Sequence, residues 1–211
     1  MKGNNMFRVA AIATLAALAV AFGFMKLSIP YPLMPFLKFD LAEIPDTVAF
    51  IILGPSAGLI TTLIHWFVLN LKGGGMVPIA GPLMKLMAIS SMMLGFYIGV
   101  KVAEGKSRRA LMVSMAVWGV ITRVVVMGLT TFLLYYTIMP DTYIPFAEKM
   151  LKTIGWEVEG ALGVALATVG LTAIFNAIHV PLSLLPATIV AEAAMKHPKI
   201  AMNVGWLRSK D

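Results

Sequence analysis

The sequence contains no cysteine and few charged residues, and both absences restrict what the protein can be. Without cysteine, the 211-residue chain cannot form a disulfide, an iron–sulfur cluster or a zinc–thiolate site. Charged residues make up 13% of the chain and apolar residues 59%, whereas soluble domains average about 25% and 45–50%. So few charges could not cover the surface of a soluble enzyme, and so apolar a chain is not disordered. The composition therefore predicts an integral membrane protein with one compact domain.

Familiar catalytic patterns are missing as well. The sequence has no P-loop, no GxSxG elbow, no dinucleotide-binding glycine pattern and no HExxH pair. Glu43 and Asp46 form a carboxylate pair, but acids at a helix start are better explained by their interaction with the helix dipole. We therefore expect no enzymatic activity. The alternative is an intramembrane enzyme built on Asp40, Glu43 or His179.

Long apolar runs divide the chain into helices. A bilayer core about 30 Å thick requires roughly 20 apolar residues per helix. Gly54-Pro55 splits one long block into two helices, because proline suits the first turn of a helix. The predicted helices cover residues 7–25, 41–53, 55–71, 77–101, 109–139 and 160–195. We predict an all-α transmembrane bundle of six helices in a single membrane domain, residues 1–211.

Three segments between these helices are expected as outer loops, at residues 26–40, 72–76 and 140–159. The first is rich in proline and aromatic residues, so we expect it to be neither helix nor strand. The third is the longest polar segment of the chain, and we also interpret it as a loop.

The distribution of charge sets the helix number and the orientation. Hydropathy alone allows six or seven helices, because the last apolar run, residues 160–191, is long for one span and short for two. If both termini and residues 101–109 share one side, that side has ten basic residues against three acidic ones, and the other has five against seven. The positive-inside rule then places both termini in the cytoplasm, which requires six helices. Since the basic residues serve orientation in the lipid bilayer, we expect no nucleic-acid partner.

Polar residues inside the predicted spans are the strongest candidates for function, because each is costly unless it is satisfied within the bundle. They are Lys85, Arg123, Asn176 and His179. Asn176 and His179 are three residues apart and share a helical face, which suits interhelical hydrogen bonds or a ligand site. For Arg123 three roles are open: reaching the membrane surface, pairing with an acid, or facing a partner subunit. We interpret His65 as a packing or interfacial residue.

Within the first predicted outer loop, the stretch from Leu33 to Asp40 is apolar for a segment between spans. Such a loop is unfavourable in water and is better accommodated if it folds over the mouth of the bundle. Aromatic rings in this loop and in later segments are available for stacking on a ligand: Phe36, Phe39, Tyr135, Tyr143 and Trp156. With the polar groups of Lys85, Asn176 and His179, they predict a site for a flat, uncharged or weakly polar aromatic ligand. The alternative is an ordinary aromatic belt at the membrane interface.

The first predicted helix is rich in alanine. Ala13, Ala17 and Ala21 follow a small-xxx-small spacing, which lets another helix approach closely. The approaching helix could belong to this bundle or to another membrane protein.

Four short motifs occur in order along the chain. They are Phe39-Asp40-Leu41-Ala42-Glu43-Ile44-Pro45, Gly54-Pro55, Gly81-Pro82 and Asn176-Ala177-Ile178-His179. In this order, and with the alanine-rich first helix, the chain resembles the substrate-binding S components of energy-coupling factor (ECF) vitamin transporters. It is most similar to the riboflavin-specific members. Two positions depart from their pattern: His179 replaces a lysine, and Lys85 replaces a polar amide.

The resemblance implies a function as well as a fold. Riboflavin would be captured from outside, without any further cofactor, and delivered with a membrane coupling subunit and two cytoplasmic ATPases. The coupling subunit would dock on Ala13, Ala17 and Ala21, in the plasma membrane of a prokaryote. The expected riboflavin-binding residues are Phe36, Leu37, Phe39, Asp40, Lys85, Thr131, Tyr135, Asn176 and His179. Other vitamins (pantothenate, thiamine or its precursor, folate) or a stand-alone small permease are the alternatives.

Overall fold

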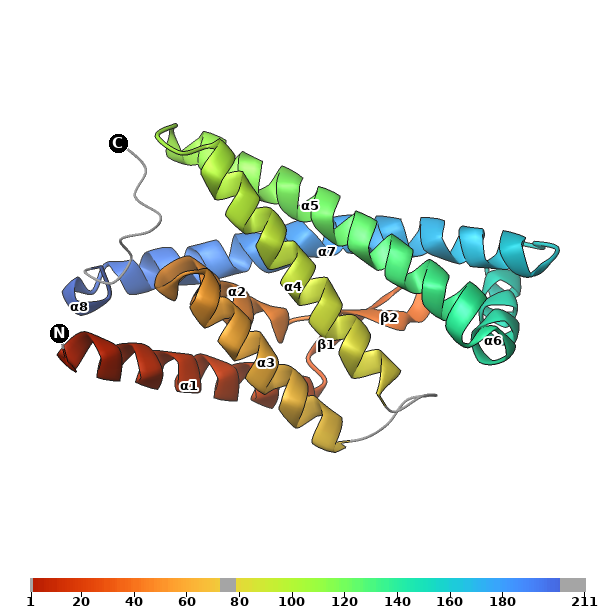
Figure 1. Ribbon diagram of the computed structural model, residues 1–211, viewed down its shortest axis with the longest axis horizontal. Helices are drawn as coiled ribbons and strands as arrows, with labels where there is room; N and C mark the ends of the chain where they lie inside the picture. The colour runs from red at the N-terminus through yellow and green to blue at the C-terminus, as the bar shows by residue number, and fades with distance from the viewer. Residues whose placement is uncertain (1, 73–78, 202–211) are drawn as a thin grey trace.

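The computed structural model describes residues 2–72 and 79–201. Helices make up most of this part of the chain, and one short hairpin interrupts them (Figure 1). The elements are α1 (Lys2–Met25), β1 (Ser28–Tyr31), β2 (Met34–Asp40), α2 (Glu43–Leu53), α3 (Pro55–Lys72), α4 (Ala80–Val102), α5 (Arg108–Phe132), the π-helical η1 (Leu133–Ile138), α6 (Pro140–Thr153), α7 (Ala161–Met195) and α8 (Pro198–Ala201). The predicted loop at 72–76 lies outside the described residues, except for Lys72, which ends α3.

Four helices in the described part of the chain are long and apolar enough to cross a membrane. They cover Asn5–Met25, Ala80–Val102, Arg108–Ile138 and Ala161–Met195. The last is one continuous helix that runs through Pro181 and Pro186. Helix α3 is shorter, and α2 has 11 residues, about half of a full span. The number of membrane crossings therefore stays a prediction.

The helices alternate in direction, so their connections gather at two ends. The start of α1, the α2–α3 turn, the α4–α5 loop and the end of α7 lie at one end, and the hairpin and α6 lie toward the other (Figure 1). The described parts of the segments expected to be cytoplasmic therefore share one end. Which side of a membrane this end faces stays a prediction from the charge pattern.

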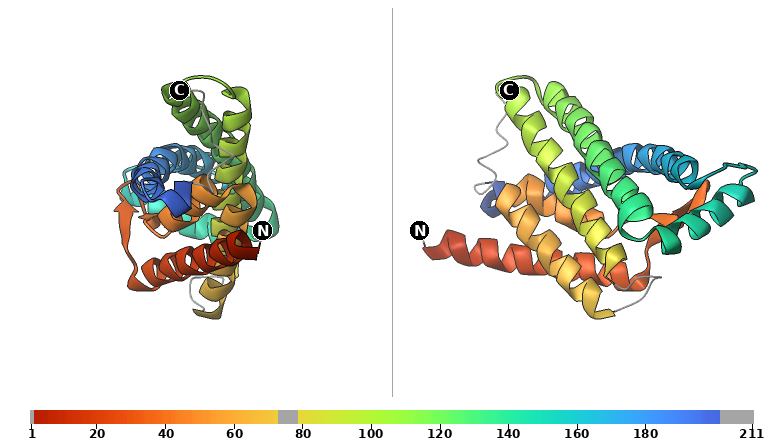
Figure 2. Two further views of the ribbon diagram at one scale, coloured as in Figure 1. Left: turned by 90° about the vertical axis from the view of Figure 1, so that its left-hand side faces the viewer. Right: turned by 45° about the vertical axis from the view of Figure 1, so that its right-hand side comes forward.

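Helices α4 and α5 pack closely enough to require glycine (Figure 2). A Cβ atom on Gly99 would lie 2.6 Å from the Met115 Cα, which is too close for any larger residue without movement. Ser114 adds a hydrogen bond of 2.8 Å to the Gly99 carbonyl. Small residues allow such approaches between apolar helices. Beside this contact, residues of α2, α4 and α7 such as Phe50, Phe96 and Val180 form the larger apolar core.

The first predicted outer loop is a β-hairpin, so the expectation that it forms no strand is wrong. Strands β1 and β2 pair antiparallel, with Ser28 opposite Asp40 and Ile29 opposite Phe39. Proline did not prevent pairing, because each strand of a two-stranded sheet has a free edge where no N–H group is needed. Tyr31, Met34 and Phe39 are buried and fix the hairpin against the helices.

The prediction of a third loop at residues 140–159 is also wrong over most of its length, because helix α6 covers Pro140–Thr153. Pro140 begins this helix, a position where proline needs no N–H partner. Tyr143, Ala147 and Leu151 recur every four residues and are buried, while Glu148 lies on the outer side. This amphipathic spacing was present in the sequence, but the overall polarity of the segment hid it.

Candidate functional site

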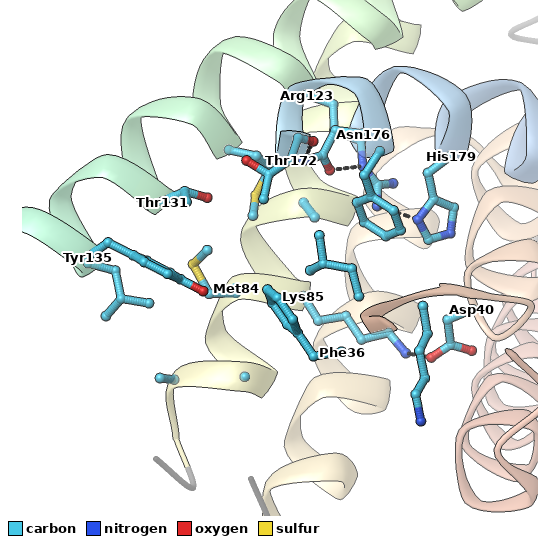
Figure 3. Close-up of a pocket in the computed structure, with 18 of the residues that line it drawn as sticks. Phe36, Asp40, Met84, Lys85, Arg123, Thr131, Tyr135, Thr172, Asn176 and His179 are labelled. Atoms are coloured by element: carbon cyan, nitrogen blue, oxygen red, sulfur yellow. Dashed lines mark hydrogen bonds and ion pairs between the residues drawn. The ribbon is translucent and has the colours of Figure 1, made fainter. Parts of the chain in front are cut away.

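A cavity of about 530 Å³ lies between the β-hairpin and helices α4, α5 and α7. Its walls are mainly apolar and aromatic, and α4 supplies Met84 and Ala88 to them. Polar groups gather in two places (Figure 3): Arg123, Asn176 and His179 from α5 and α7, and Lys85 with Asp40 on another side. A concave, mainly apolar space with a few polar groups is the usual form of a small-molecule site.

The structure brings together the residues predicted from the sequence. Eight of the nine expected ligand residues line the cavity: Phe36, Leu37, Asp40, Lys85, Thr131, Tyr135, Asn176 and His179. Phe39 is the exception. Its buried ring stacks on Phe175, with 4.8 Å between the ring centroids, and meets the His179 ring edge-on at 5.5 Å. Phe175 lines the cavity, so Phe39 supports the wall from behind.

A buried ion pair lies beside the predicted polar residues. The Arg123 guanidinium donates to both Glu43 carboxylate oxygens, at 2.6 and 3.0 Å, and both side chains are almost fully buried. It also donates to the Asn176 Oδ1 at 3.0 Å and contacts the His179 Nδ1 at 3.1 Å. Since a guanidinium can only donate, His179 accepts at Nδ1 and carries its ring proton on Nε2. Arg123 therefore orients both residues expected to bind the ligand.

A second series of polar contacts begins at Asp40 and Lys85 in the cavity wall and continues away from the cavity to His65 of α3 and Asp46 of α2. The Lys85 ammonium lies 2.5 Å from the Asp40 Oδ2 and 3.5 Å from the His65 Nε2. His65 in turn donates from Nδ1 to Asp46 at 2.8 Å. Because a lysine ammonium can only donate, His65 accepts at Nε2. His65 is buried and connects Lys85 to Asp46, so it has a polar role beyond the packing or interfacial role we expected.

The sequence interpretation missed the role of Glu43 and left that of Arg123 open. Both acids of the Glu43/Asp46 pair are buried and bound to basic side chains, so the helix-dipole explanation is incomplete. From the sequence three roles are open for Arg123, and in the structure it pairs with an acid, Glu43. One signal in the sequence could have indicated this pair. A cation within a membrane span needs a partner, so acids at the boundary of a neighbouring span are candidate partners for Arg123.

The remaining aromatic and alanine candidates divide clearly. Tyr143 lines the cavity, whereas Trp156 is exposed and lies outside it. Ala13, Ala17 and Ala21 are exposed on α1, while Ala16 and Ala19 between them are buried. The small-xxx-small stripe is thus not covered by residues 2–72 or 79–201.

The fold has a known counterpart, although no protein-family model and no curated protein matches the sequence. A solved structure of the S component of a bacterial ECF transporter superimposes with a TM-score of 0.62. The match covers 91% of this chain and 97% of that chain, with 22% sequence identity. At this identity the likeness concerns the arrangement of the backbone. The chain therefore has the fold of an ECF S component.

Proposed function

We propose that this protein is the substrate-binding S component of an ECF vitamin importer and that its ligand is riboflavin. The single observation that carries the proposal is the cavity under the hairpin. Its volume of about 530 Å³ suits a tricyclic vitamin, and its walls combine aromatic rings with polar groups gathered in two places. An isoalloxazine ring has the matching chemistry: one apolar edge, one edge with hydrogen-bonding groups, and two flat faces for stacking.

The polar cluster would read the hydrogen-bonding edge of the ligand. Asn176 donates one N–H to the Thr172 carbonyl and accepts from Arg123 at Oδ1, so its second N–H and second lone pair remain for a ligand. The Nε2–H group of His179 lies 3.5 Å from the Glu43 carboxylate and also interacts with the Asp40 backbone, so a ligand acceptor would replace these contacts. The resemblance of Asn176-Ala177-Ile178-His179 to the Asn-x-x-Lys motif of the riboflavin-specific members supports the role of Asn176, whereas His179 stands where those members have lysine.

ATP-driven transport would require partners, because the sequence has no P-loop with which to bind and hydrolyse ATP. The exposed stripe of Ala13, Ala17 and Ala21 on α1 suits close packing by a helix of a membrane coupling subunit. Two cytoplasmic ATPases would supply the energy. The vitamin would enter from the outer side, where the hairpin covers the cavity.

The absorption spectrum of the purified protein tests the ligand. We expect a yellow protein with flavin absorbance, or a colourless one that quenches riboflavin fluorescence when the vitamin is added. A protein that binds no riboflavin after unfolding, washing and refolding would refute the ligand assignment. A thermal-shift panel with pantothenate, thiamine, its precursor and folate then identifies the ligand within the same class.

A further inference from the structure

The ion pair between Lys85 and Asp40 lies in the wall of the cavity, between α4 and the end of β2. Asp40 is held on both sides: its Oδ1 accepts from the Ala42 N–H at 2.8 Å, and its Oδ2 binds the Lys85 ammonium at 2.5 Å. The two side chains are 19% and 24% exposed, so the pair is partly shielded from water. Asp40 therefore holds the ammonium of Lys85 in a fixed and neutralised position.

The other enclosed charges are matched too. Arg123 and Glu43 form a buried pair, and His179 accepts from Arg123, which leaves its ring uncharged. Lys38 also lines the cavity, but it is exposed at the rim, where water and salt screen its charge. Among the described residues that line the interior of the cavity, the two cations and the two carboxylates therefore balance. Behind this wall, Lys85 also contacts His65, which binds Asp46.

A ligand with a phosphate group meets an unfavourable balance in such a cavity. A phosphate monoester carries about −1.5 to −2 charges at neutral pH, and burying a charge without a partner is costly. To pair with the phosphate, Lys85 would have to leave Asp40 and expose that carboxylate to the like charge of the ligand. We propose that Asp40 makes the cavity selective for the neutral vitamin over its phosphate ester by neutralising Lys85. This proposal rests on the proposed function.

This selectivity is measured as a ratio, the dissociation constant of flavin mononucleotide divided by that of riboflavin. For the wild-type protein in detergent, we expect flavin mononucleotide, the phosphate ester of riboflavin, to bind at least tenfold more weakly than riboflavin. Asp40→Asn removes the charge but keeps the shape and an acceptor for the Ala42 N–H. The ammonium would then keep its contact with the His65 ring but lose its paired carboxylate. For a phosphate about 10 Å away in the cavity, the attraction at an effective dielectric constant of about 20 amounts to more than tenfold in affinity. We expect the selectivity ratio to fall at least tenfold in this variant.

Two further variants keep the test decisive if Asp40→Asn folds poorly. Lys85→Met leaves Asp40 as an unpaired anion, so the ratio should rise several-fold. The double variant Asp40→Asn/Lys85→Met has neither charge, and its ratio should return to within about threefold of wild type. Lys38→Met is the matched control at the rim and should change the ratio by less than about threefold. Because each ratio is measured on one protein sample, partial loss of folded protein cancels.

The outcomes separate the two proposals. If the wild-type protein binds riboflavin but Asp40→Asn leaves the ratio unchanged, the role of Asp40 is wrong and the proposed function stands. Equal binding of both flavins by the wild-type protein overturns the role of Asp40 as well. If the wild-type protein binds neither flavin, the proposed ligand fails, and the selectivity for the neutral form fails with it.

Discussion

The buried Arg123–Glu43 pair gives the sharpest test of how this bundle is held together. Arg123→Met replaces the guanidinium by an apolar side chain of similar length and leaves the Glu43 carboxylate buried without its partner. Breaking a buried pair on one side costs about 3–5 kcal/mol. In a domain of this size, each kcal/mol lowers the melting temperature by about 2–4 °C. We therefore expect a decrease of about 6–20 °C in detergent, measured by intrinsic tryptophan fluorescence.

A double-mutant cycle separates the pair from the loss of packing. Adding Glu43→Gln to Arg123→Met removes the orphaned charge, so the double variant should be more stable than Arg123→Met alone, with a coupling energy of at least about 2 kcal/mol. Arg108→Met is the matched control, because its ion pair with Glu192 is about half exposed and should contribute no more than about 1 kcal/mol. Additive effects in the cycle, or a decrease for Arg123→Met as small as for the control, would refute this account of the pair.

Three further predictions concern the ligand, the partner and the helix packing. Asn176→Leu should weaken riboflavin binding more than tenfold in a fluorescence titration, because it removes at least one buried hydrogen bond; an unchanged affinity would exclude Asn176 from the site. Ala17→Trp should abolish co-purification with a coupling subunit and its ATPases yet leave riboflavin affinity intact, and a complex that survives would show that the α1 stripe is not the docking face. Gly99→Ala should destabilise the protein by about 1–3 kcal/mol, because the added Cβ clashes with Met115. The control Gly170→Ala, whose Cβ would meet no atom of another described helix within 4 Å, should be neutral or slightly stabilising. Equal melting temperatures of the two variants would argue against the close α4–α5 contact.

Those elements of the fold that rest on long apolar runs could be predicted, whereas the short elements could not. The Gly54-Pro55 break follows from the positions of glycine and proline. The continuous last helix follows from the charge distribution, because hydropathy alone allows one or two spans there. The hairpin at Ser28–Asp40 depends on burial of Tyr31 and Phe39 against helices that are distant in the sequence. Local propensity gives little information on such tertiary support. The prolines of residues 26–40 therefore predict a segment without strands, although two strands form there.

The candidate site was partly predictable for a different reason. A polar group within a membrane span is costly, which makes it a candidate functional residue. This argument identifies Lys85, Asn176 and His179, and all three line one cavity. The partner of Arg123 could not be assigned in the same way. Glu43 lies 80 residues away in the sequence, and no spacing rule connects an acid at the start of one helix to a base in the middle of another.

The two ion pairs of the cavity differ in burial, and this difference assigns them different roles. The Arg123–Glu43 pair is sealed from water and joins α2, α5 and α7, so it cannot be broken without leaving a buried charge. It is suited to holding Asn176 and His179 in one fixed geometry. The Lys85–Asp40 pair is partly solvated, contributes less to stability, and controls the charge that a ligand meets. Changes at the buried pair should therefore alter stability first, and changes at the solvated pair should alter ligand selectivity first.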